Sequence, residues 1–249
     1  MRDFAGKTAL ITGGGGFIGG LVTINNGGKL APTGTLTISN NLTAFLGVVS
    51  SGGIIKSGTG TLTLSGSGNT IRGALQATAG TLAFTGTFTT ASRISASDSA
   101  GNSGTISISG TLTQSGGTFT VRSFQIANNS NNSVGTCNIL PGASVTLGGG
   151  AMLGDNGTGG VAGGTGTFNQ SGGTFNSNGE FWTAGGTSNV NISGGSFTSS
   201  RLYIGGGGNS NSASTSTLTV SGGTAQCSTY DISRKQHFKF IRIKRDIFS

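Results

Sequence analysis

The sequence predicts an all-β fold, a β-solenoid in which each of about eight to ten coils is one repeat. Composition is the first reason: 50 of 249 residues are Gly, 2 are Pro and 8% are charged, against about 25% in a typical globular domain. The second reason is that short strings of alternating polar and apolar residues recur 20 to 30 residues apart. The third is that no segment has helical periodicity. We therefore expect one elongated domain.

Four strings in the first half of the chain have the two-residue period of a strand with one buried face. They read GTLTIS, GTLTLS, GTLAFT and GTISIS, and they occupy residues 34–39, 60–65, 80–85 and 104–109. Their starts lie 26, 20 and 24 residues apart, which fits one such strand in each coil. The apolar members expected to point inward are Leu62, Leu64, Leu82, Phe84, Ile106 and Ile108.

Two markers recur together in the second half. The first is SGGTF or a variant, and it begins at Ser115, Pro141, Ser171, Ser193 and Ser221. The second is an apolar segment that begins at Phe124, Ala151, Phe181, Leu202 and Thr229. Because the two sets of spacings agree to within a residue, each unit is predicted to have fixed internal geometry and one variable loop.

This alignment makes three further predictions. The side chains expected inside the coils are Phe119, Val145, Phe175 and Phe197. The variable segments expected along one edge of the rod are residues 128–133, 155–164, 185–188 and 205–216. Cys137 and Cys227 lie three units apart, or about 14 Å along the axis, which is too far for a disulfide, so two free thiols are expected.

Residues 7–20, KTALITGGGGFIGG, run from an apolar segment into a glycine cluster, as a strand does before a phosphate-binding turn. Thr12, Gly13, Gly16 and Gly19 resemble the opening motif of the extended short-chain dehydrogenases/reductases. That motif requires a following helix and an acidic residue about twenty positions on, and neither follows here. The Tyr and Lys of that family are also missing at their spacing. We expect a vestigial motif without a cofactor, in a glycine-rich first coil or a remnant of gene fusion or mis-joining.

Groups suited to catalysis are sparse. His237 is the only histidine, and the carboxylates of the repeat region, Asp98, Asp155, Glu180 and Asp231, fall in different coils. No catalytic or metal site is predicted, and the chain is not expected to be an enzyme. A carbohydrate-active or carbohydrate-binding β-helix is the alternative. Trp182 and Tyr203 occupy neighbouring positions of successive units, where they could form an aromatic stripe for sugar rings.

Residues 56–82, KSGTGTLTLSGSGNTIRGALQATAGTL, contain a longer pattern. They resemble the autotransporter-associated β-strand repeat of passenger domains, which runs G-x-G-T-L-T-L-S-G-x-N-T, then a glycine-centred turn, then A-G-T-L. The matching positions are Gly58, Gly60, Thr61, Leu62, Leu64, Gly66, Asn69, Thr70, Gly73, Ala79, Gly80, Thr81 and Leu82. Taken with the looser units after Ser115, the resemblance covers about residues 21–233.

The resemblance implies a single-stranded right-handed parallel β-helix, extracellular or at the bacterial cell surface, that acts as a stalk or adhesin rather than a catalyst. It divides the chain into an atypical segment or cap at 1–20, solenoid repeats at 21–233 and a basic tail at 234–249. The implied partner is a carbohydrate or a host or cell-surface protein, and the chain would be a monomer or part of a larger one. Because no signal peptide or run of 18 apolar residues is visible, export is expected from the repeat alone.

Two features suggest other partners. The tail holds six of the 14 Lys and Arg residues and one acid. Because the chain has no recognisable nucleic-acid-binding motif, a nucleic-acid role is not expected. We expect the tail to form an edge strand or a cap. Thr35 and Thr37, with Thr61 and Thr63, could begin a threonine ladder of the kind that binds ice. Ala83 and Ser107 interrupt the second column, so ice binding is a minor alternative.

Overall fold

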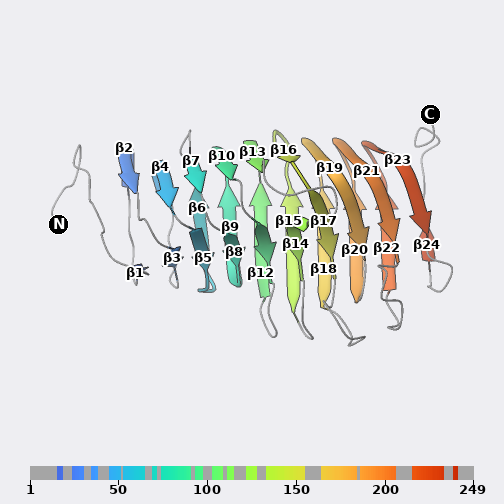
Figure 1. Cartoon of the computed structure of the whole chain (residues 1–249), viewed down its shortest axis with the longest axis horizontal. Helices are drawn as coiled ribbons and strands as arrows, with labels where there is room; N and C mark the ends of the chain where they lie inside the picture. The colour runs from blue at the N-terminus through green and yellow to red at the C-terminus, as the bar shows by residue number, and fades with distance from the viewer. Residues whose placement is uncertain are drawn as a thin grey trace.

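The computed structural model shows an all-β chain in which the paired strands are parallel and stack along one long axis (Figure 1). The structure describes residues 16–18, 24–30, 35–38, 45–51, 53–64, 69–71, 74–90, 93–97, 103–108, 111–114, 122–127, 133–154, 164–183, 186–205, 215–232 and 238–240. No helix in this part of the chain is long and apolar enough to span a membrane.

Each coil has three strand positions, which we call faces I, II and III in the order in which the chain visits them. Face I stacks ten strands, namely β2 (Ile24–Leu30), β4 (Phe45–Ser51), β6 (Thr61–Leu64), β9 (Ala79–Phe84), β12 (Ser103–Ile108), β15 (Val134–Ile139), β18 (Thr165–Gln170), β20 (Thr187–Ile192), β22 (Thr215–Val220) and β24 (Phe238–Phe240).

Face II begins with the end of β4, and from β6 to β22 each face I strand is followed by a face II strand. Its members are β7 (Asn69–Ile71), β10 (Thr87–Thr90), β13 (Thr111–Gln114), β16 (Ser144–Leu147) and the first parts of β19 (Thr174–Thr183), β21 (Ser196–Ile204) and β23 (Thr224–Ile232).

Face III completes the coil. Its members are β1 (Gly16–Ile18), β3 (Thr35–Ile38), β5 (Gly53–Lys56), β8 (Leu75–Ala77), β11 (Ile94–Ala96), β14 (Arg122–Ile126), β17 (Gly150–Leu153) and the second parts of β19, β21 and β23. Nine parallel pairings join these ten segments, which confirms the predicted β-solenoid of about eight to ten coils.

The core lies between the three faces and is built from the inward side chains of the alternating strands. The six predicted first-half side chains and Val145, Phe175 and Phe197 are all buried, which confirms those predictions. In the second half the core is aromatic: the rings of Phe168 and Phe175 meet edge to face at a centroid distance of 4.9 Å, and those of Phe175 and Phe197 stack at 5.4 Å. Phe181 packs against the same group.

Lys56 is an exception to the apolar core, because it occupies an inward position of face III and is fully buried. The residues at the same position in the next two coils are Ala77 and Ala96, which leave room for its long side chain. Its Nζ donates to the carbonyl oxygen of Gly58, and burial lowers the pKa of the amine.

The predicted register of the repeats is right in most coils. Thr61, Thr81 and Thr105 are stacked as expected, and so are Ser144, Thr174, Ser196 and Thr224, which lie three residues after the starts of the markers at Pro141, Ser171, Ser193 and Ser221. The starts of the second marker at Phe124, Ala151, Phe181 and Leu202 are stacked as well.

Three assignments were wrong. Thr35 and Thr37 lie on face III opposite Gly53 and Ile55, because a strand at 45–51 intervenes before Thr61, so they form no ladder with Thr61 and Thr63. The unit assigned to Ser115 pairs through Thr111–Gln114, so Leu112 takes the buried place given to Phe119, which lies outside the described residues. In the last unit Tyr230, not Thr229, aligns with Leu202.

The four variable segments all connect face III to face I of the next coil. Most of their residues lie outside the described part of the chain, but the strands on either side, β14 and β15, β17 and β18, β19 and β20, and β21 and β22, occupy the same two columns. All four segments therefore begin and end at the same edge of the solenoid, as the repeat alignment predicted.

The two ends of the chain contribute strands to the stack. Gly16–Ile18, from the glycine-rich motif, pair in parallel with β3, and Gly16 lies opposite Leu36. Thr12, Gly13 and Gly19 of that motif lie outside the described residues. In the basic tail, Phe238–Phe240 form β24, which pairs with β22 and adds the last described strand of face I.

Cys137 and Cys227 are free thiols, as predicted. Cys137 is buried on face I, whereas Cys227 is half-buried on face II three coils later, so they do not share a column. Burial raises the pKa of both thiols, which keeps them in the unreactive protonated form at neutral pH.

A column of glycines forms the corner between faces I and II in the last coils. Gly173, Gly195 and Gly223 occupy equivalent positions and have φ values of 64°, 79° and 74°, in the left-handed region that disfavours a side chain. A Cβ added at Gly195 would also clash with the carbonyl oxygen of Gly173, which accepts a hydrogen bond of 2.9 Å from the Ser196 amide. Glycine is therefore required here both by conformation and by the close approach of the coils.

We predict that Gly195→Ala lowers the free energy of unfolding by about 2–4 kcal/mol, because it forces alanine into the left-handed region and pushes the coils apart. Ser193→Ala, at an exposed position of the same turn, is the matched control and should change stability by less than about 1 kcal/mol. Urea unfolding followed by circular dichroism measures both. Equal effects of the two changes would show that the corner does not need glycine.

Candidate ligand-binding site

Outward side chains of face III form an ordered array across the last three coils. The strands β19, β21 and β23 supply them in register: Glu180, Arg201 and Thr229 form one column, and Trp182, Tyr203 and Asp231 form the next. They point outward because the alternate residues Phe181 and Leu202 are buried in the core. We call Glu180, Trp182, Arg201, Tyr203 and Asp231 the aromatic–charged cluster.

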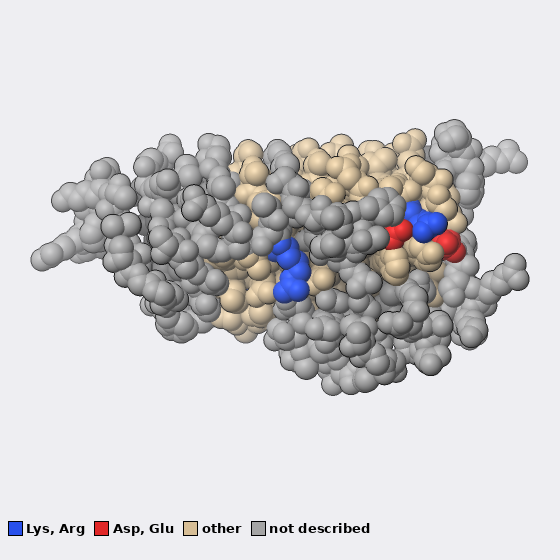
Figure 2. All heavy atoms as spheres, in the orientation of Figure 1, with Lys and Arg blue, Asp and Glu red and all other residues tan. Residues whose placement is uncertain are grey.

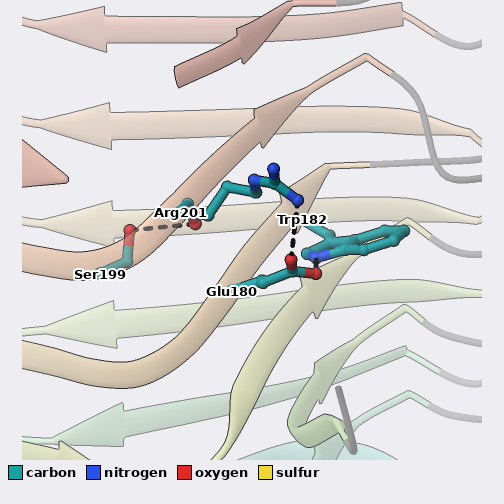
Figure 3. Close-up of polar contacts among 4 residues, drawn as sticks. All are labelled: Glu180, Trp182, Ser199 and Arg201. Carbon is teal, nitrogen blue, oxygen red and sulfur yellow. Dashed lines mark hydrogen bonds and ion pairs between the residues drawn. The ribbon is translucent and has the colours of Figure 1, made fainter. Parts of the chain in front are cut away.

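Glu180 contacts both Trp182 and Arg201 of the cluster (Figure 3). Its carboxylate accepts a hydrogen bond from the indole Nε1 of Trp182 and an ion-paired hydrogen bond of 3.2 Å from Nη1 of Arg201. The Glu180 side chain is only 6% exposed, so its carboxylate lies beneath the surface, whereas the Arg201 side chain is 37% exposed. The contacts fix the orientation of the indole and of the guanidinium at the surface.

The aromatic pair lies beside this ion pair. The rings of Trp182 and Tyr203 are 4.8 Å apart between centroids and tilted by 34°, and the Arg201 guanidinium carbon lies 5.1 Å from the centre of the Tyr203 ring. A cation at that distance is attracted to the ring face by about 0.5–1 kcal/mol at a partly exposed site. The two rings and the guanidinium therefore form one packed, solvent-facing unit.

Asp231 adds a second carboxylate at the end of the aromatic column. A hydrogen bond with the Asp231 carboxylate is the main reason that the pKa of the Tyr203 hydroxyl is raised, with burial as a smaller cause. At neutral pH the Tyr203 hydroxyl is therefore protonated and donates to Asp231. The array offers carboxylate acceptors, guanidinium donors and aromatic carbon within three coils.

The sequence predicted part of this site. The placing of Trp182 beside Tyr203 agrees with the structure, but the carboxylates were considered dispersed, whereas Glu180 and Asp231 lie on the same face two coils apart. Arg201 was not considered at all. Its signal was the shared i, i+2 spacing, because Glu180-Phe-Trp182 and Arg201-Leu-Tyr203 put a charged and an aromatic residue at corresponding positions of two units. Asp98, Asp155 and His237 lie outside the described residues.

Charged surface is rare on the described part of the molecule. Figure 2 shows red and blue side chains together near the right-hand end and one separate blue area nearer the middle, while the other described surface in that view is uncharged. Within the described ranges no group of three His, Cys, Asp or Glu residues could hold a metal ion.

No protein-family model, curated protein or solved structure in the three comparisons matches the chain.

Proposed function

We propose that this protein is a non-catalytic stalk or adhesin-like β-solenoid, exposed at a bacterial cell surface or outside the cell, that presents a binding face near its C-terminal end. The observation that carries the proposal is the unbroken parallel stack of coils with the aromatic–charged cluster on its outer side. Each added coil lengthens a stack of this kind. The stack can therefore hold an array of side chains far from its other end without a large globular core. The resemblance of residues 56–82 to passenger-domain repeats supports the surface location.

The geometry favours binding over catalysis. Glycoside hydrolysis needs one carboxyl group that transfers a proton and a second that acts as base or nucleophile. In the cluster both oxygens of Glu180 are engaged by neighbouring side chains, and the Asp231 carboxylate accepts from Tyr203. Groups used in this way orient a surface and are poorly placed to exchange protons with a substrate.

We predict that beads coated with the purified chain are retained on cell monolayers or on surfaces coated with cell-wall polysaccharide under flow, and that beads coated with serum albumin are not. The reason is that a bead coated with many chains presents the cluster many times, which raises avidity. Retention by the wild type with no release of reducing sugar supports the proposal. A failure to adhere to any surface, or polysaccharide cleavage that is lost in Glu180→Gln, would contradict it.

Ice binding is a second candidate, because the corrected register gives a longer threonine column than the sequence suggested. Five successive coils of face I place threonine at the same outward position, in the order Thr61, Thr81, Thr105, Thr136 and Thr167. In the neighbouring column the amides of Asn138, Asn169 and Asn191 form a ladder with donor–acceptor distances of 3.0 and 2.9 Å. From β6 to β22 the outward residues of this face are uncharged.

If this face orders water, the chain should slow ice recrystallisation in frozen sucrose, and Thr136→Tyr should abolish the effect by breaking the middle of the column. Thr198→Tyr, on face II, is the matched control and should retain it. Wild-type protein that behaves as buffer does would eliminate this candidate.

A further inference from the structure

We propose that the aromatic–charged cluster binds a neutral, extended oligosaccharide that runs along the axis of the solenoid. This inference rests on the proposed binding function and names the chemical class of its ligand. Among the described residues the cluster is the place where aromatic rings, a guanidinium and carboxylates meet at the surface.

The polar groups of the cluster match pairs of sugar hydroxyls. Arg201 has five N–H donors, of which Nη1 is paired with Glu180, and its side chain is 37% exposed, so other donors face solvent. Asp231 has two acceptor oxygens, and the Tyr203 hydroxyl occupies part of that capacity. The Arg201 guanidinium can donate to one hydroxyl group of a sugar, and the Asp231 carboxylate can accept from another. The same sugar can contact the aromatic carbon of the two rings.

The periodicity of the site favours an extended ligand. Successive members of each column are about 4.8 Å apart, since they belong to neighbouring strands of a parallel sheet. Trp182 and Tyr203 repeat an aromatic group at this interval, and Glu180, Arg201 and Thr229 repeat a polar group beside it. A chain of linked sugar rings lying along the axis would meet an aromatic ring in two successive coils and a polar side chain in all three, which a single sugar ring cannot do.

The charge of the site favours a neutral ligand. Among the described residues of the cluster, the charge of Glu180 is balanced by its ion pair with Arg201, and Asp231 adds one further carboxylate. An anionic polysaccharide would place like charges beside Asp231, which costs free energy, whereas a neutral sugar can donate hydroxyl hydrogens to it. The net charge of +8 also attracts polyanions nonspecifically, so any test must separate that effect.

The inference can be tested by biolayer interferometry with the immobilised full chain in 150 mM salt. The probes are three soluble neutral polysaccharides, galactomannan, xyloglucan and mixed-linkage β-glucan, with polygalacturonate as the anionic arm. We expect saturable binding of at least one neutral polymer. Trp182→Ala and Asp231→Asn should each weaken it about tenfold, because they remove the ring contact and the charged acceptor respectively. Gln226→Ala, an exposed change on the face II part of β23, should leave it unchanged.

Asp231→Asn keeps the shape of the side chain, so it remains informative if Trp182→Ala fails to fold, which circular dichroism will show. No binding of any neutral polymer, binding that neither variant weakens, or stronger binding of polygalacturonate that depends on Trp182 would each overturn the inference. If bead adhesion persists in those cases, only the ligand class is wrong. If adhesion is also absent, the proposed function is wrong as well.

Discussion

The parallel hydrogen-bonded register between successive coils is the constraint on which the rest of this molecule depends. Because strands such as β15, β18, β20 and β22 pair residue for residue with their equivalents in the neighbouring coils, a side chain is fixed by its place in a column rather than by local sequence alone. The same register lines the core with stacked phenylalanines, brings glycines together at one corner, and aligns Asn138, Asn169 and Asn191 into an amide ladder. The chain can therefore fold with few charges and many small residues, since backbone pairing and column stacking satisfy most of its polar groups.

The outer faces differ in what the register exposes. From β6 to β22 the outward residues of face I are uncharged, and most are threonine, serine or asparagine, while the end of face III brings together the charged residues Glu180, Arg201 and Asp231. In the aromatic–charged cluster a nearly buried acid, Glu180, positions an indole and a guanidinium, so the exposed groups are held in place before any ligand arrives. Preorganisation of this kind lowers the entropy lost on binding. It is consistent with the proposed role in recognition.

The sequence predicted the fold well because a two-residue period repeated in every coil is visible without knowing the partners. It assigned the inward residues of three successive first-half strands and the register of most later units correctly. It failed at Thr35 because nearly identical strings, GTLTIS and GTLTLS, fall on different faces, and only the length of a whole coil distinguishes them. It misplaced the last unit by one residue because Tyr203 and Tyr230 look equivalent, although Tyr203 points outward and Tyr230 aligns with the buried Leu202. The cluster was found only in part, since the position of Asp231 beside Tyr203 follows from the stacking of the coils, and the i, i+2 spacing shared by two units indicates only Glu180 and Arg201.

Disulfide cross-linking tests the register most directly. In a chain with both natural cysteines replaced by alanine, Thr136→Cys and Thr167→Cys place two thiols at stacked positions of neighbouring coils, where the Cα atoms are about 4.8 Å apart and within the range of a disulfide. The matched pair Thr136→Cys and Asn169→Cys is displaced by two residues along the strand, which separates the Cα atoms by about 8 Å. Mild oxidation followed by thiol counting in denaturant should show a bridge in the first pair and two free thiols in the second. A bridge in the displaced pair, or none in the stacked pair while the protein remains folded, would contradict the solenoid register and every placement that depends on it.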